Sequence, residues 1–246
     1  MTTRPVPRIH VYTLAWNEQL ILPHFLRHYA RFCERIVVFD NESTDATPEI
    51  IAGCPQAERR VWSSGGQIND QTYLDIKNSA YRESRGQADW VIVCDADEFL
   101  YHPQIQTQLA TYLRRGVTLP RVRGYDMVGH AVPAASDDLL AQYRHGAPNP
   151  WMDKQVIFAP ELDMRFTPGA HRHEAVPGAR RSWFARLQLL HYKMFTAEQY
   201  IERTRALRAR LSEINRRNKW GTHYLQSDEA LREEFVLWQS KARRVV

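Results

Sequence analysis

The chain has 246 residues, of which 43% are hydrophobic and 25% are charged, and this composition is typical of one globular domain with or without an appended arm. No stretch of about 18 apolar residues occurs, which excludes a membrane-spanning helix, and the N-terminal MTTRPVPR lacks the apolar core of a signal peptide. The net charge of +5 favours anionic partners, such as nucleotide phosphates, nucleic acid or an acidic membrane surface, or serves solubility alone.

Strand-like and helix-like segments alternate in the first half of the chain. β-Branched and aromatic residues predict strands at 9–16, 36–39, 60–62 and 90–94. Apolar residues at helical spacing predict helices at 22–33, 47–53, 70–85 and 105–116, with Thr47 as the N-cap of the second. This alternation predicts an α/β fold in which a mostly parallel sheet is flanked by helices.

The second half is less regular. Residues 117–132 and 155–158 have strand character, 166–176 reads as a loop or hairpin, and 187–194 is the last predicted strand. From the predicted N-cap Thr196, a polar helix extends to about residue 217. Its basic residues outnumber its acidic ones and are Arg203, Arg205, Arg208, Arg210, Arg216 and Arg217.

The cysteines of the chain show no pairing pattern. Cys33, Cys54 and Cys94 have neither CxxC nor Cys/His spacing, and Cys94 ends an apolar run in which a thiol acts as a small hydrophobic group. We therefore expect no disulfides and a reducing, cytoplasmic environment.

Acidic and amide side chains follow several of the predicted strands. Asn17 and Glu18 follow the first strand, Asp40 the second, and Asp95 and Asp97 the fourth. Because ligands of parallel α/β sheets bind beyond the carboxyl ends of the strands, these groups are expected to converge on one site.

The sequence Asp95-Ala96-Asp97 is the sharpest signal. Residues two apart in an extended segment point to the same side, so both carboxylates face one position. Their repulsion is relieved by a cation, and hard oxygen ligands suit Mg²⁺ or Mn²⁺. The alternative is a solvated acidic turn. For Asp40 two interpretations stay open: its carboxylate binds a base or ribose, or it belongs to a helix-entry turn.

Several segments together resemble glycosyltransferases of the GT-A type, family 2, in the compact branch whose metal motif reads DxDEF. These segments are LAWNE at 14–18, VVFDNESTDAT at 37–47, Lys77-Asn78, DWVIVCDADEFL at 89–100, KQVIF at 154–158, PGAHRH at 168–173 and LHYK at 190–193. The resemblance implies a GT-A catalytic domain over 1–195, with a nucleotide-sugar half at about 1–118 and an acceptor half at about 119–195. A helical C-terminal arm over 196–246 follows.

The resemblance also implies roles for individual residues. Asp40 would bind the base or ribose beside the backbone at Leu14 and Ala15, Lys77 and Lys193 would offset diphosphate charge, and Asp95 would contact ribose and metal. The expected donor contacts are Leu14, Ala15, Asn17, Glu18, Asp40, Lys77, Asp95, Ala96 and Lys193, and the expected metal ligands are Asp95, Asp97 and His191. From the residues alone, His191 is either a metal ligand or a hydrogen-bonded core residue.

Family 2 enzymes typically invert the anomeric carbon and need a base for the acceptor hydroxyl. Asp153 is the first candidate, followed by Glu174 and His173. Zinc at His171-Arg-His173-Glu174 is not expected, because the HExxH spacing is absent.

The predicted function is transfer of a single sugar from a nucleotide-diphosphate sugar to a glycan or lipid-linked acceptor, in cell-envelope or polysaccharide synthesis. The QxxRW motif of processive synthases is absent, which disfavours polymer synthesis. A nucleotidyltransferase is an alternative, but no glycine-rich loop follows the first strand. A nucleic-acid-binding protein is the non-enzymatic alternative, disfavoured because the acidic loops would repel phosphate. We expect the arginines after Thr196 to form a solvated face or a peripheral contact with the inner face of the membrane.

Overall fold

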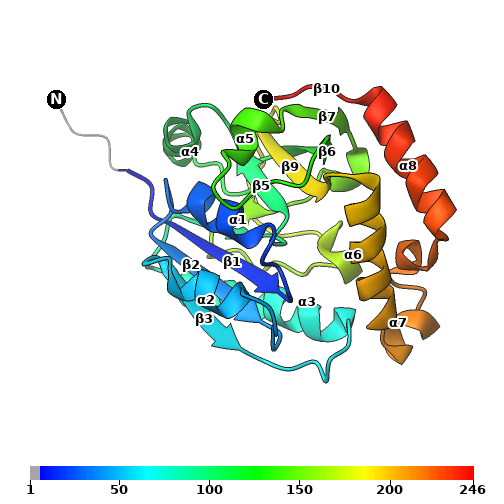
Figure 1. The fold of residues 1–246 in the computed structure, drawn as a ribbon. Helices are drawn as coiled ribbons and strands as arrows, with labels where there is room; N and C mark the ends of the chain where they lie inside the picture. The colour runs from blue at the N-terminus through cyan, green and yellow to red at the C-terminus, as the bar shows by residue number, and fades with distance from the viewer. Residues whose placement is uncertain (1–5) are drawn as a thin grey trace.

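The structure is a computed structural model that describes residues 6–246. The first five residues of MTTRPVPR, where no signal peptide is expected, lie outside the described residues. Figure 1 shows two sheets side by side, with helices on their outer faces and a group of C-terminal helices along one edge.

The first sheet is the predicted parallel one. Its strand order is β3-β2-β1-β4-β8. The bounds are β1 Ile9–Ala15, β2 Arg35–Asp40, β3 Ala57–Val61, β4 Trp90–Val93 and β8 Ile157–Phe158. The first four strands in the order are parallel, whereas β8 runs antiparallel to β4. β-Branched residues such as Val11, Ile36, Val38 and Ile92 fill the core beneath this sheet, which confirms the α/β prediction.

The predicted helices of the first half are present. Their bounds are α1 Leu22–Tyr29, α2 Thr47–Ala52, α3 Asp70–Ser79 with a 3-10 turn at Ala80–Ser84, and α4 Ile105–Arg114. Thr47 is not the N-cap of α2, contrary to prediction. Asp45 Oδ1 accepts a hydrogen bond from the Thr47 amide, while the Thr47 hydroxyl accepts one from the Glu18 amide at 2.8 Å. Thr47 therefore anchors the loop after β1.

A second sheet, with the order β10-β7-β6-β9-β5, was not predicted as a separate layer. Its strands are β5 Glu98–Tyr101, β6 Val122–Val128, β7 His145–Pro148, β9 Leu187–Met194 and β10 Arg243–Arg244, with the short helix α5 at Leu139–Gln142. β6 and β9 are parallel, and the other pairs are antiparallel. Because β5 starts directly after Asp97, the segment 94–97 is where the chain passes from one sheet to the other.

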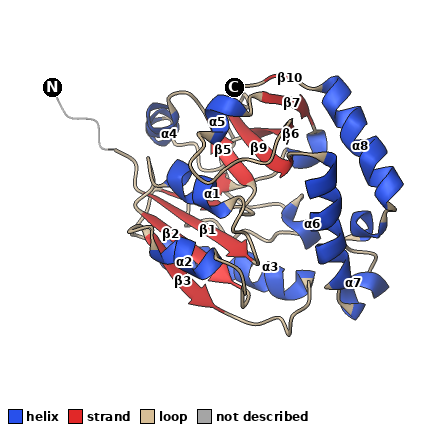
Figure 2. Cartoon of the chain, viewed as in Figure 1, coloured by secondary structure: helices blue, strands red, loops and turns tan. Residues whose placement is uncertain are grey.

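The C-terminal segment folds into three helices (Figure 2). They are α6 Ala197–Ala209, α7 Glu213–Arg217 and α8 Asp228–Lys241, with a 3-10 turn at Thr222–Leu225. Thr196 caps α6 as predicted, since its hydroxyl accepts from the Gln199 amide. The predicted single helix to 217 is wrong, because it ends before Leu211, and Ser212 caps a new helix.

Two further features of residues 6–246 bear on the predictions. No helix there is both long and apolar enough to cross a membrane. Cys33, Cys54 and Cys94 are free thiols in this part of the chain, and Cys94 is buried in the main core, where it packs as a small hydrophobic group.

Candidate active site

A cavity of about 660 Å³ lies where the carboxyl ends of β1 and β4 meet the second sheet and the C-terminal helices. The predicted site residues that line it are Leu14, Ala15, Glu18, Lys77, Asp95, Ala96, Asp97, His191 and Lys193. Asn17, Asp40, Asp153, His173 and Glu174 are predicted site residues that do not line it. The cavity thus lies where the parallel-sheet argument expected the site. Most of the predicted residues that do not line it lie in loops, whose direction the sheet does not determine.

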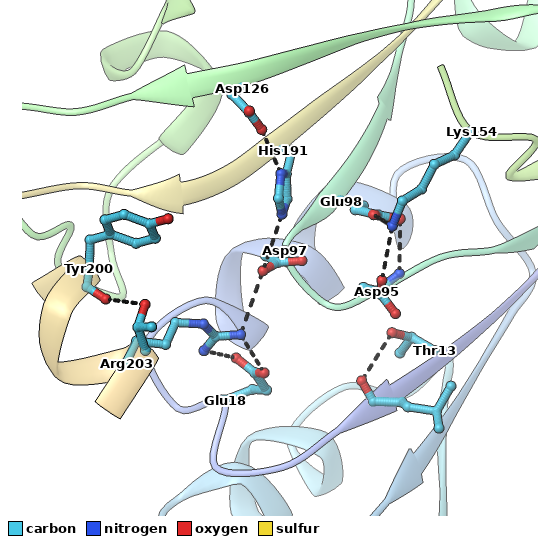
Figure 3. Close-up of polar contacts among 12 residues, drawn as sticks. Thr13, Glu18, Asp95, Asp97, Glu98, Asp126, Lys154, His191, Tyr200 and Arg203 are labelled. Atoms are coloured by element: carbon cyan, nitrogen blue, oxygen red, sulfur yellow. Dashed lines mark hydrogen bonds and ion pairs between the residues drawn. The ribbon is translucent and has the colours of Figure 1, made fainter. Parts of the chain in front are cut away.

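Asp95 is surrounded by cationic groups. Lys77 Nζ lies 2.6 Å from one of its carboxylate oxygens, and Lys154 Nζ lies 3.3 Å from the other. Lys154 also donates to Glu98 at 2.5 Å, and Glu98 accepts from the Asp95 amide (Figure 3). Burial raises the pKa of Asp95, but the two lysines outweigh burial and hold that pKa well below its usual range. Asp95 is therefore an anion fixed by two ammonium groups.

Asp97 faces His191 across the start of the second sheet. His191 Nε2 lies 3.6 Å from Asp97, and its Nδ1 lies 2.7 Å from Asp126 Oδ1. In the β5–β9 pair, Glu98 lies opposite His191. Asp97 directly precedes Glu98 and is therefore close to His191. Burial lowers the pKa of His191, but Asp97 and Asp126 outweigh burial and raise it to about 9. The imidazole is thus oriented by one carboxylate and presents its other nitrogen to a second.

Glu18 connects the first strand to the C-terminal helices. Arg203 of α6 donates two hydrogen bonds to its carboxylate, both at 2.8 Å, and also lies 3.5 Å from Asp97. Figure 3 shows the resulting chain from Asp126 through His191, Asp97 and Arg203 to Glu18. The planar guanidinium suits this fork geometry, so α6 is fixed against the loop after β1.

The donor atoms present fit a divalent cation held by two protein side chains. Two ligands at right angles, each about 2.1 Å from an ion, lie about 3 Å apart, so the 3.6 Å between Asp97 and His191 is compatible with one ion. Asp126 holds the histidine in the manner of a carboxylate–histidine–metal triad. Residues 6–246 contain no group of three or more His, Cys, Asp and Glu side chains placed to hold a metal. The predicted set of Asp95, Asp97 and His191 is therefore not assembled, because Asp95 is turned towards Lys77 and Lys154.

Asp40 is fully buried and lies outside the cavity. Its carboxylate accepts from Arg59 Nε at 2.7 Å and from the Ser43 amide at 3.0 Å. Its neighbour Asn41 lines the cavity instead, with its amide group bound to Ser64. The interpretation of Asp40 as part of a turn has structural support, whereas contact with a base would require Asp40 to leave Arg59. Asn17 is likewise committed, to Thr44 and Ser43.

The candidate bases do not reach the cavity. Asp153 accepts from the Gly124 amide at 2.7 Å, and Glu174 is exposed, 3.8 Å from Arg165. His173 contacts the Glu174 carbonyl and the Arg181 guanidinium. None of the three lines the cavity in this structure, and their role as the base stays a prediction.

His171, which was not a candidate, lines the cavity. Its Nδ1 lies 3.0 Å from the Trp151 carbonyl oxygen, an atom that only accepts, so Nδ1 carries the proton and Nε2 keeps a lone pair. The ring lies over Trp151 with centroids 4.9 Å apart. Burial, together with the charge of Lys154, lowers the pKa of His171 to about 3, so the ring is neutral at physiological pH.

The C-terminal arginines are mostly committed to the protein itself. Beyond Arg203, Arg205 pairs with Asp228, Arg208 donates to the Tyr224 and Gln226 carbonyls, and Arg210 lies over Trp16 at 3.5 Å. The expected solvated or lipid-binding face stays a prediction, since Arg205, Arg216 and Arg217 are exposed. The cavity residues without a predicted role include Trp16, Asn41, Asp126, Lys154, His171, Arg203 and Arg210.

The two-sheet α/β arrangement, with its cavity at the carboxyl ends of a parallel sheet, is the GT-A architecture. Residues 11–184 match the family model for Glycosyl transferase family 2. The match spans more than half of the chain, which therefore belongs to this family. A comparison with curated proteins finds no match.

Several solved glycosyltransferase structures are similar to this chain at low identity. S. aureus TarS 1–349 in complex with UDP-GlcNAc is 13% identical with a TM-score of 0.49, over 93% of this chain and 71% of that chain. Another S. aureus TarS structure is 14% identical with a TM-score of 0.48, over 82% of this chain and 39% of that chain. Glucosyl-3-phosphoglycerate synthase from Mycobacterium tuberculosis, in complex with Mn²⁺, UDP and phosphoglyceric acid, is 20% identical with a TM-score of 0.32, over 48% of this chain and 43% of that chain. The chain thus spans less than half of the latter two.

Proposed function

We propose that this protein transfers a single sugar from a nucleotide-diphosphate sugar to an acceptor hydroxyl, with a divalent cation at Asp97 and His191. The observation that carries the proposal is the pairing of these two side chains beside two buried lysines, at the carboxyl ends of the parallel strands. Family membership and the UDP-containing structures of TarS support the same reaction class.

The donor diphosphate is assigned to the region between Asp97 and the two lysines. Lys77 and Lys154 are almost completely buried and hold positive charge at the cavity wall. In a cavity shielded from water, such fixed charges interact strongly with phosphate oxygens. The nucleoside then lies towards Leu14, Ala15 and Asn41 at the ends of β1 and β2, which are among the cavity-lining residues of the nucleotide half.

A bound Mg²⁺ or Mn²⁺ supplies Lewis-acid stabilisation of the leaving diphosphate. On the protein side, Asp97 and His191 would hold the ion, and Asp126 fixes the imidazole orientation. Arg203 lies 3.5 Å from Asp97 and limits how far that carboxylate can turn.

The proposed proton acceptor is His171. Its Nε2 lone pair takes the proton of the acceptor hydroxyl while the hydroxyl oxygen bonds to the anomeric carbon, and the bond from that carbon to the diphosphate breaks with its electron pair on phosphate. One such displacement inverts the anomeric configuration. A diphosphate beside Lys154 would offset the charge that lowers the pKa of His171, which makes the imidazole a stronger base in the ternary complex.

The acceptor and location are proposed from family membership. A cell-envelope or polysaccharide glycan, free or lipid-linked, is the acceptor class, and the cytoplasm is the compartment in which nucleotide sugars would reach the enzyme. Single transfer is favoured over polymer synthesis because the QxxRW motif of processive synthases is absent from the sequence.

The test is a screen of UDP-, GDP- and dTDP-sugars for binding and slow donor hydrolysis, with Mn²⁺, Mg²⁺ or EDTA. We expect one nucleotide to bind in a metal-dependent way, and Asp97→Asn to abolish that dependence. Asp153→Asn is the matched control, because this aspartate lies outside the cavity. Nucleotide binding that is equal in EDTA and unaffected at Asp97 would contradict the proposal, and so would a nucleotide bound away from the lysines in a crystal.

A further inference from the structure

The loop at residues 180–186, which reads RRSWFAR, is the most exposed aromatic surface in the described part of the chain. Trp183 is 93% exposed and Phe184 is 71% exposed. Large aromatic side chains normally lose most of their area to packing, and two adjacent ones left in water indicate an interaction surface. The loop lies outside the catalytic assignments made above.

The exposure of this loop does not come from a frayed backbone. The Arg180 carbonyl accepts from the Thr118 and Leu119 amides, and the Arg180 amide donates to the Thr118 hydroxyl at 2.9 Å. The buried Ser182 hydroxyl accepts from the Arg121 amide and donates to the Phe184 carbonyl at 3.0 Å. The backbone therefore holds both aromatic rings outward from a fixed base.

Arginines flank the two aromatic residues along the chain and at the adjoining start of β6. Those of the loop and the adjoining start of β6 are all exposed, and they are Arg121, Arg123, Arg180, Arg181 and Arg186. Across residues 6–246, none of these five forms an ion pair with a carboxylate. Partial desolvation of the Arg181 guanidinium, which contacts His173 and Gln155, lowers the pKa of Arg181, and the neighbouring Arg121 lowers it further. The positive charge of this surface is thus not neutralised from within.

We propose that this loop docks the protein on an anionic phospholipid membrane, with Trp183 and Phe184 entering the headgroup boundary and the arginines contacting lipid phosphates. The apolar rings suit the boundary between headgroups and acyl chains, and the guanidinium groups suit the anionic headgroups. A symmetric contact with a second copy would bring the two arginine clusters together, and their repulsion disfavours it. In α6, by contrast, Arg203, Arg208 and Arg205 are engaged by Glu18, the Tyr224 carbonyl and Asp228.

The loop adjoins the cavity wall. Arg181 contacts His173 at 2.8 Å, two residues from the cavity-lining His171. Docking through the loop would therefore hold the acceptor side of the cavity near the lipid surface. The docking itself is independent of catalysis, so it can be tested without donor, metal or acceptor.

The experiment is co-sedimentation with vesicles of phosphatidylcholine alone, or containing about one-third phosphatidylglycerol. We expect binding only to the anionic vesicles and a loss of about tenfold or more in partitioning for Trp183→Ser/Phe184→Ser. Arg180→Gln/Arg186→Gln should weaken binding about fivefold per arginine and reduce its salt dependence, since three arginines of the surface remain. Both exposed pairs can be changed without altering the core, which unchanged thermal unfolding would verify.

The matched control is Val236→Ser/Leu237→Ser on α8, which removes two other apolar side chains that are 56% and 50% exposed. This variant should bind vesicles as the unmodified protein does. The proposal fails if the unmodified protein ignores anionic vesicles or if the control loses binding equally. It also fails if the loop variants abolish binding to a single-stranded oligonucleotide or dissociate a dimer, with vesicle binding unchanged.

Discussion

Arg203 and Glu18 form a two-pronged ion pair, with both hydrogen bonds at 2.8 Å, between residues 185 positions apart in the chain. Glu18 follows β1, and Arg203 lies in the middle of α6. Arg203 of this pair also lies 3.5 Å from Asp97. The C-terminal helices are therefore a wall of the cavity, joined to the candidate metal position by a charged contact.

Replacing Arg203 by Met should destabilise the protein by about 2–4 kcal/mol, because Glu18 is left buried without a counter-charge. Donor affinity should fall as well, since α6 loses its attachment to the loop after β1. Thermal unfolding and nucleotide titration measure the two effects. Arg205→Met is the control, as its partner Asp228 lies on the surface, and it should change neither quantity. Equal behaviour of the two variants would contradict the role assigned to Arg203.

The two lysines at Asp95 should respond differently to removal. Lys154→Met leaves Glu98, which is 1% exposed, without its cation, and should cost about 3–5 kcal/mol of unfolding free energy. Lys77→Met leaves Asp95 still paired with Lys154, so stability should change less while donor affinity drops. Denaturant unfolding and donor binding, measured on both variants, separate the effects. A larger stability loss for Lys77→Met would contradict this division.

The parts of the site that sequence reasoning located are those set by local periodicity. Alternation of strands and helices predicted the parallel sheet, and its carboxyl ends indicated the position of Asp95 and Asp97. The role of Asp40 stayed open and Asn41 was not singled out, because adjacent residues at a strand end point to opposite sides and the sequence does not say which side is open.

The remaining site residues depend on contacts between distant segments. The second sheet escaped prediction because β7 and β10 are short and carry Gly, Pro or Arg instead of an alternating pattern. Asp126 acquires its role only through the β6–β9 pairing, and Arg203 through the docking of α6. Asp153 illustrates the same difficulty: in an irregular loop no period indicates direction, and its carboxylate faces the Gly124 amide.

His171 should be required for transfer and not for donor binding. His171→Gln should lower kcat by about 10²–10⁴-fold, the usual contribution of a positioned base, with donor Kd within a factor of a few of the unmodified value. His173→Gln serves as the control, since this histidine lies outside the cavity. Once an acceptor is found, steady-state kinetics measure kcat and donor titration measures the donor Kd of each variant. A variant that loses donor binding in parallel with kcat would assign His171 to binding alone.

Stability should fall in mild acid because His28 is buried as a neutral ring. Burial lowers the pKa of His28 to about 4, and its Nε2 contacts the Leu100 carbonyl at 2.9 Å. The unfolded chain has the ordinary pKa of about 6.5 and binds the proton more readily, so this stability is present above pH 6.5 and is lost as pH falls towards 4. Between pH 8 and pH 5 the loss attributable to His28 is about 2 kcal/mol.

Denaturant unfolding of the unmodified protein and His28→Gln at both pH values would isolate this contribution. The variant should be less stable at pH 8 but lose less on acidification. The exposed His145 provides the control, and His145→Gln should keep the full pH dependence. An identical loss for all three proteins would show that other groups, such as the buried His10 and His24, account for the acid sensitivity.

Asp126 should affect metal affinity without touching the metal. Its Oδ1 lies 2.7 Å from His191 Nδ1, while Oδ2 accepts from the Asn149 side chain at 2.7 Å, so the carboxylate is itself held in place. Asp126→Asn removes the charge that orients and polarises the imidazole, and Mn²⁺ affinity should fall about 10–100-fold, as is usual for such supporting carboxylates. Asn149→Ala, which only loosens Asp126, should have a smaller effect in the same direction. Calorimetric titration of Mn²⁺ in the presence of nucleotide measures both variants against Asp97→Asn, which should bind no metal. If Asp126→Asn binds Mn²⁺ as tightly as the unmodified protein, the supporting role assigned to Asp126 is contradicted.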